Sequence, residues 1–141
     1  MTNEFPKPEP AITPETKPFW DAAKNKDFML VKCTECGTFR NPVSITGNIC
    51  PECGSRKPGE WVKASGKGKV HTYTAVHRTF HPAFEKELPY ILVIVELDEG
   101  PRYLANMREA EPGDMKLDMP VEVIFEKLTD DIMLPQFRPA K

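Results

Sequence analysis

Two cysteine pairs constrain the fold of this chain more than any other feature. All four cysteines fall in one window, as Cys33-Thr-Glu-Cys36-Gly37 and Cys50-Pro-Glu-Cys53-Gly54. Each C-x-x-C pair can hold a metal ion from a tight turn, and the glycine that follows lets a backbone amide approach a thiolate. Two such pairs supply the four sulfur ligands of a tetrahedral zinc site. We therefore predict a zinc ribbon held by Cys33, Cys36, Cys50 and Cys53.

Two other uses of four cysteines compete with zinc. Two disulfides would need an oxidising compartment, whereas the first thirty residues show no export signal, so we expect a cytoplasmic protein. A redox iron site is the second alternative, because Cys50-Pro-Glu-Cys53-Gly54 is similar to one rubredoxin knuckle. The short spacing between the pairs favours zinc. Four cysteine ligands leave no position for water or substrate, so the predicted zinc is structural and no cysteine remains as a nucleophile.

Composition excludes several classes of protein. The chain has 141 residues, of which 40% are hydrophobic and 28% charged, as in a globular protein of one domain or two very small ones. Its longest apolar run is Tyr90 to Val95, which is far too short to span a membrane. The formal net charge is −2, so no overall positive field is available to hold a nucleic-acid backbone.

The order of elements predicts a mainly β protein. Five prolines in residues 1–18 forbid a helix there and predict an extended arm. A short helix follows at 17–25, with Thr16 as its cap and Phe19 and Trp20 on its apolar face. From Trp61 onward the pattern is that of strands, over 69–79, 88–97, 102–107, 121–126 and 132–137. Five strands with hardly any helix predict a small antiparallel barrel.

These elements carry a pattern that resembles a known family. The stretches that carry it are Lys17–Ala23, Cys33–Gly37, Cys50–Ser55, Trp61, Gly66–Thr74, Pro89–Tyr90, Glu99–Arg102, Pro120–Val123 and Pro135–Pro139. Together they resemble the DUF35 family from about residue 12 onward. The resemblance implies an N-terminal helix, a rubredoxin-like zinc ribbon and a C-terminal OB-fold. We accordingly divide the chain into an arm and helix (1–27), a zinc ribbon (28–60) and an OB-fold (61–141).

The resemblance also implies a function. Members of the DUF35 family are small partners of thiolase-superfamily enzymes that act on acyl-CoA thioesters, and the resemblance implies the same role for this chain. These partners include thiolases and aldolases of fatty-acid, sterol and aromatic-acid breakdown, for example a benzoylsuccinyl-CoA-type thiolase. We expect a non-catalytic subunit of a hetero-oligomer, in which a thiolase-like or lipid-transfer-type large subunit supplies the catalytic residues. The small subunit would assist assembly and share a coenzyme A thioester as a ligand.

Charge and aromatic residues suggest where such contacts would lie. Residues 61–86 carry a net charge of +4, and Lys63, Lys67, Lys69 and Arg78 are candidates for contacts with CoA phosphates. The alternative is that these side chains are solvated residues of strand edges. Candidate partner contacts are Phe19, Trp20, Phe80 and Phe84, because exposed aromatic residues often anchor interfaces. Their alternative is packing inside the chain's own fold.

A function of a different class remains open at this point. Zinc ribbons and OB-folds also occur in nucleic-acid-binding modules. Such a module needs a basic groove with stacking aromatic residues, and the negative net charge opposes it. A stand-alone enzyme is less favoured still, because no pair of nucleophile and base and no open metal site is apparent.

Overall fold

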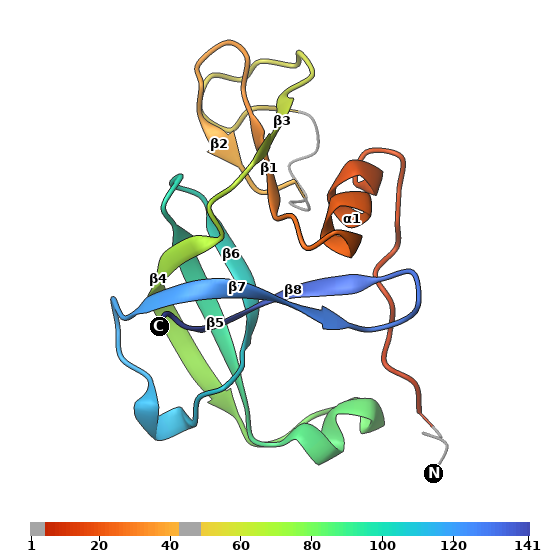
Figure 1. Cartoon of the computed structure of the whole chain (residues 1–141), viewed down its shortest axis with the longest axis vertical. Coiled ribbons are helices and arrows are strands. Elements are labelled where there is room, and N and C mark those ends of the chain that lie inside the picture. Colours follow the sequence, from red (N-terminus) through yellow and green to blue (C-terminus); the bar gives the residue numbers. More distant parts are fainter. Residues whose placement is uncertain (1–4, 43–48) are drawn as a thin grey trace.

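The computed structural model describes residues 5–42 and 49–141, which form one short helix, a three-stranded sheet and a closed barrel (Figure 1). In chain order the elements are α1 (Lys17–Lys24), β1 (Met29–Lys32), β2 (Phe39–Arg40), β3 (Glu60–Lys63), β4 (Lys67–Val76), the 3-10 helix η1 (Pro82–Glu87), β5 (Tyr90–Leu97), β6 (Arg102–Met107), the 3-10 helix η2 (Pro112–Asp114), β7 (Pro120–Lys127) and β8 (Met133–Pro139). The predicted mainly β class, with a helix, a four-cysteine region and a five-stranded barrel, is confirmed. No helix in the described residues is long and apolar enough to cross a membrane.

The three-stranded sheet carries the cysteine region. Its order is β2-β1-β3, and both pairings are antiparallel. Val31 at its centre lies opposite Arg40 on one side and Trp61 on the other. The backbone amide of Ala64 donates a hydrogen bond to the carbonyl oxygen of Phe28 at 2.7 Å, which extends the β1–β3 pairing toward the barrel. β3 therefore crosses the predicted boundary at residues 60/61, and the division into domains remains a prediction.

The barrel has the strand order β4-β5-β6-β8-β7 and closes where β4 pairs with β7. β5 alternates between buried and half-buried residues along its whole length, as expected of a strand with one face in the core. Three of its inward residues, Val93, Val95 and Leu97, are at most 2% exposed. β6 and β8 run parallel and pair only at Met107 and Phe137. This contact between strands far apart in sequence completes the barrel.

Several local predictions were wrong in detail. The first barrel strand ends at Val76 rather than residue 79, and its register shifts between Val70 and Thr72. This bulge ends the simple alternation of faces after Val70. Thr16 precedes α1 but its side chain makes no capping bond, because its hydroxyl bonds to Thr13 instead. The segment between the first two predicted barrel strands contains η1, which the sequence pattern did not indicate.

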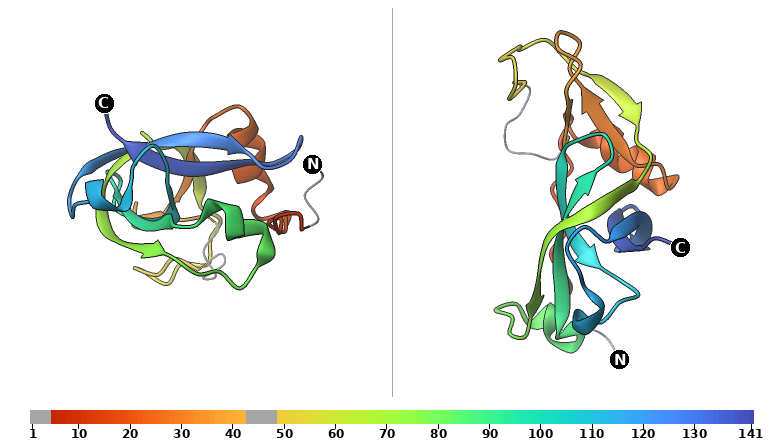
Figure 2. Two further views of the ribbon diagram at one scale, coloured as in Figure 1. Left: turned by 90° about the horizontal axis from the view of Figure 1, so that it is seen from below. Right: turned by 90° about the vertical axis from the view of Figure 1, so that its left-hand side faces the viewer.

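Helix α1 joins the two sheets. It contacts β1 of the three-stranded sheet and β8 of the barrel, and the two views agree on this placement (Figures 1 and 2). Phe19 and Trp20 on its inner face are 1% and 6% exposed. The ring of Phe19 packs against Phe28 and Tyr103, with centroids 6.1 and 6.5 Å away. One continuous aromatic cluster therefore connects the helix, the ribbon entrance and the barrel.

Candidate metal centre

The two C-x-x-C-G turns have the same backbone geometry. In the first, the Gly37 amide donates to the Cys33 carbonyl oxygen at 2.9 Å, and in the second the Gly54 amide donates to that of Cys50 at 2.9 Å. Each turn is closed by the amide of its first cysteine, which donates to the carbonyl oxygen of Thr38 or Ser55. Both glycines have positive φ angles, 76° and 74°, which only glycine adopts without cost. The sequence therefore builds two matching turns that face each other.

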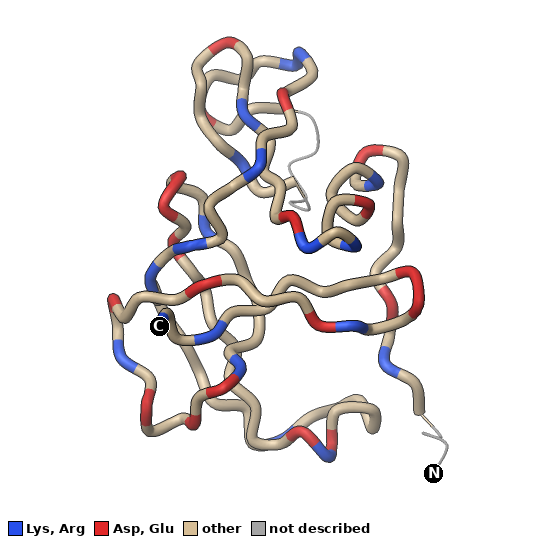
Figure 3. Tube along the Cα trace, viewed as in Figure 1, with Lys and Arg blue, Asp and Glu red and all other residues tan. Residues whose placement is uncertain are grey.

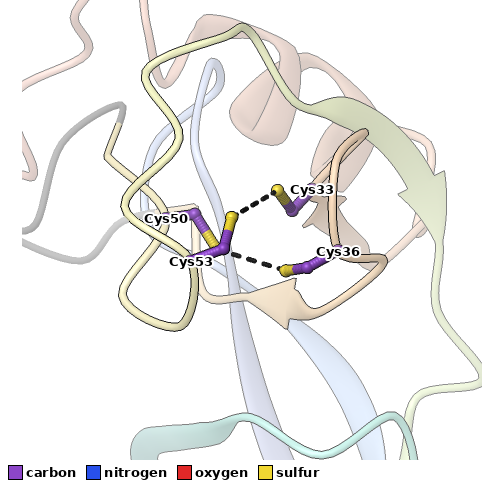
Figure 4. A group of neighbouring side chains, drawn as sticks. All are labelled: Cys33, Cys36, Cys50 and Cys53. Atoms are coloured by element: carbon purple, nitrogen blue, oxygen red, sulfur yellow. Dashed lines mark hydrogen bonds between the residues drawn. The ribbon is translucent and has the colours of Figure 1, made fainter.

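The turns bring all four sulfur atoms together (Figure 4). The four Sγ atoms lie within 4.8 Å of one another. The Cys33–Cys53 and Cys36–Cys50 distances are 3.7 and 3.6 Å, and no pair forms a disulfide. A tetrahedron with metal–sulfur bonds of about 2.3 Å has edges of about 3.8 Å. The donor set thus fits a metal ion with four thiolate ligands, and the disulfide alternative is not what the structure contains.

Hydrogen bonds within the first turn favour the thiolate form of its two cysteines. Backbone amides of Cys36 and Glu35 lower the pKa of Cys33 to about 6, and the side chain and backbone of Thr38 lower the pKa of Cys36. The backbone of Ser55 lowers the pKa of Cys53, but burial and the three neighbouring sulfurs outweigh it and raise that pKa to about 12. Four adjacent thiols cannot all ionise unless a cation compensates their charge. A metal ion bound by all four sulfur atoms would have no coordination position left for substrate.

The candidate CoA residues do not converge on one site. Lys67 begins β4 and Arg78 lies two residues beyond its other end, so roughly 30 Å of extended strand lies between them. Lys63 pairs with Asp27 at 2.9 Å and Lys69 lies 3.9 Å from Asp118. Figure 3 shows basic and acidic residues interspersed along the trace. Only Lys67 and Lys69, two residues apart on one strand, form a local basic pair.

The four aromatic candidates separate into two groups. Phe19 and Trp20 are buried in the aromatic cluster. This is the packing in the chain's own core that was the alternative to a partner contact. Phe80, by contrast, is 99% exposed just before η1. Phe84 is half-buried within η1, where its ring lies 5.7 Å from His81 and 6.3 Å from Tyr90.

Sequence reasoning missed two arginines that the fold partly buries. Arg108 donates to both carboxylate oxygens of Glu126, at 2.8 and 2.9 Å, and also reaches Glu87. Lys7 of the arm pairs with that same Glu87 at 2.8 Å, which fastens the arm to η1. Arg40 is 8% exposed beside the first cysteine turn. No sequence signal marked either arginine, because their partners and burial arise from distant segments.

Fold and site together define a class of protein in which a tetracysteine ribbon is joined by a short helix to an OB-fold barrel. A family profile described as "ChsH2, C-terminal OB-fold domain" matches residues 61–126. A DUF35 domain-containing scaffold protein of Methanocaldococcus jannaschii is 40% identical over 113 residues, which cover 79% of this chain and 77% of that protein. The chain belongs to the DUF35 family.

Other relatives are larger or have known structures. The probable enoyl-CoA hydratase alpha subunit of Thermomonospora curvata is 37% identical over 99% of this chain, but the match spans only 43% of that protein's length. A chain of the structure titled "Ltp2-ChsH2(DUF35) aldolase" is 36% identical, with a TM-score of 0.80 over 94% of this chain and 100% of that one. A DUF35 protein of Sulfolobus solfataricus, at 15% identity and a TM-score of 0.59, shares the fold.

Proposed function

We propose that this chain is a non-catalytic scaffold subunit of a complex with a thiolase-like enzyme that acts on acyl-CoA thioesters. The observation that carries the proposal is the match over the full length of one chain of the Ltp2-ChsH2(DUF35) aldolase structure, at 36% identity and a TM-score of 0.80. The hydratase subunits among the relatives also handle CoA thioesters by their names, which supports the substrate class.

The cysteine site supports a scaffold rather than a catalyst. Its four thiolates are the strongest nucleophiles in the chain, and all four point at one centre. A metal there holds the two turns together, and binding energy at such a site is folding energy. We propose that this metal is zinc. The large subunit would then supply the catalytic residues.

Co-purification tests the scaffold proposal. The chain is expressed with and without the thiolase-like protein encoded nearest to its gene, and each sample is assayed for cleavage of acyl-CoA substrates. We expect a stable hetero-oligomer on size exclusion and turnover only when the large protein is present. Turnover by this chain alone, or co-purification of nucleic acid instead of protein, would contradict the proposal.

Replacing one ligand tests the zinc proposal. Cys50 is 1% exposed, so Cys50→Ser should lose the metal and unfold the ribbon. Thr34→Ser is the matched control, because Thr34 is an exposed position of the first turn that supplies no ligand. Elemental analysis should find one zinc per chain in the wild type and the control. Stoichiometric iron, or folded protein without metal, would refute the assignment.

Partner and ligand contacts are proposed at the positions that remain exposed. Phe80 is the best-placed aromatic anchor, because its side chain is almost fully in solvent. Lys67 and Lys69 project from the same face of β4 and could meet CoA phosphates together. Exchanging Phe80 for Ala should weaken association with the large subunit about tenfold or more without changing the stability of the isolated chain.

A further inference from the structure

A cavity of about 260 Å³ lies on the outside of the barrel, where the N-terminal arm passes η1 and the end of the β7–β8 hairpin (Figure 1). Lys7 and Pro8 of the arm close one side of it. Most of its wall is apolar and comes from Phe84, Tyr90, Leu92, Leu128 and Leu134. No ligand of the metal centre lines it. A mostly apolar cavity with a few polar groups is typical of a small-molecule site.

The charged groups around this cavity are already paired with one another. Lys7 lies 2.8 Å from Glu87. Arg108 lies 3.3 Å from Glu87 and 2.8 Å from Glu126. These two cations and two anions balance, so they leave no net charge to attract an ion. An ion that entered the cavity would lose its hydration without gaining a free partner, so the walls favour an uncharged molecule.

Gln136 of β8 provides a free hydrogen-bond donor. Its side chain lies on the opposite face of the strand from the buried Phe137, and the residue is only 6% exposed. Its Oε1 accepts a hydrogen bond from the Asn106 amide at 2.7 Å, which fixes the orientation of the side-chain amide. The Nε2 atom has no partner among the described residues, and it is not sealed inside the protein. Since Gln136 lines the cavity, this donor is accessible from it.

Size and chemistry together define the ligand. At about 30 Å³ for each water molecule, the cavity has room for about nine waters, or for a molecule of about nine non-hydrogen atoms. The rings of Phe84 and Tyr90, with centroids 6.3 Å apart, offer aromatic surface for an apolar body. We propose that this cavity binds a small uncharged aromatic carbonyl compound, whose oxygen accepts a hydrogen bond from Gln136 Nε2.

Benzamide is of the required size and is the probe for this site. The metal-loaded full chain is titrated with it while amide signals are followed by NMR, including the side-chain amide of Gln136. We expect saturable shifts at that side-chain amide and at the backbone of Leu92. Benzoate and benzylamine carry the same ring with a negative or a positive charge, and each should bind about tenfold more weakly or worse. Absence of saturable shifts, an unmoved Gln136 amide, or equal binding of either ion would overturn the proposal.

Three variants locate the site. Gln136→Glu keeps an oxygen for the Asn106 amide but loses the donor, so benzamide binding should weaken about tenfold or more. Leu134→Phe places a ring in the cavity and should exclude benzamide, which provides a test that leaves Gln136 itself unchanged. Leu104→Phe is the matched control, because Leu104 is 63% exposed on β6 and does not line the cavity.

Dispersed amide spectra establish that each variant is folded, and the control should bind benzamide as the wild type does. Unchanged binding in Gln136→Glu or in Leu134→Phe would refute the proposal, as would weakened binding in Leu104→Phe.

Discussion

At the scale of single residues, Trp20 shows how tightly the helix is bound to the rest of the chain. Its side chain is 6% exposed and meets the ring of Phe19 edge-on at 5.1 Å. We expect Trp20→Ala to lower the free energy of unfolding by about 3–5 kcal/mol, because it leaves a large cavity in the core. Urea titration of the isolated chain measures this loss. Phe80→Ala is the control and should change the free energy by less than about 0.5 kcal/mol.

The same residues show what sequence can and cannot predict. The cysteine cluster was predictable because a C-x-x-C-G turn is local, and each turn forms from five consecutive residues. Burial of Phe19 and Trp20 was not predictable, because an apolar helix face can bind either a partner or the chain's own barrel. Here β1 and β8 cover that face. Arg40 gave no signal at all, since its burial depends on Gly59 and the β5–β6 turn.

At the scale of elements, Gly54 in the second cysteine turn allows the cost of backbone strain to be measured separately from that of a steric collision. A Cβ at Gly54 would meet nothing within 4 Å, yet its φ angle is +74°. Gly54→Ala should therefore cost about 1–2 kcal/mol from backbone strain alone and weaken metal binding. Gly113→Ala is a matched control, with equally open space and no positive φ. If the two variants were equally stable and bound zinc equally well, the positive φ angle of the turn would not contribute to stability or to metal affinity.

The ion pair between Arg108, which follows β6, and Glu126 of β7 gives the stability of the barrel a dependence on pH. Hydrogen bonds from Arg108, followed by its charge, lower the pKa of Glu126. A lowered carboxylate pKa stabilises the fold above the unfolded-state value of about 4.3, and this contribution is lost as the pH falls through the folded-state value.

Glu126→Gln tests this contribution. The variant should be about 1 kcal/mol less stable at pH 7, because the pair is half-exposed and partly screened. The difference should shrink below pH 4, where the wild-type carboxyl also becomes protonated. Glu85→Gln, an exposed position on η1, is the control. The free energy of unfolding of both variants is measured from pH 3 to pH 7. The same dependence on pH in Glu126→Gln and Glu85→Gln would contradict the expectation.

Strands were predictable where the pattern is strong. β5 is a continuous run rich in Ile and Val, as expected of a buried strand, and both β5 and β6 were found within two residues of the expected bounds. β2 was missed, because a strand of two residues has no periodicity and exists only through its pairing with β1. The bulge in β4 was missed for a similar reason, since a register shift is set by the partner strand.

At the scale of the whole molecule, metal binding and barrel stability should be coupled. Phe28 and Leu30, at 2% and 0% exposure, enter the same core as Phe137 of the barrel. Removal of the metal would expose this surface and destabilise the barrel as well as the ribbon. Both tryptophans, Trp20 and Trp61, lie outside the barrel strands. Their fluorescence therefore reports on the helix and ribbon, and far-UV circular dichroism on the strands.

The two signals test the coupling directly. We expect the metal-loaded chain to unfold in one transition with the same midpoint by both probes. Chelator should lower both midpoints together. A barrel transition that stays in place while the fluorescence transition shifts would show that the two halves fold independently.

The closed order of the barrel limits how this protein can meet other chains. Each of its five strands has a neighbour on both sides, but β6 meets β8 at one pair and β4 meets β7 only at residues 67–69. An added strand could pair only with these partial edges or with the outer strands β2 and β3 of the small sheet, so copies of the chain have no long open edge on which to build fibrils. We therefore expect assembly to form mainly through side chains and loops, where single surface substitutions can separate the chains while each remains folded.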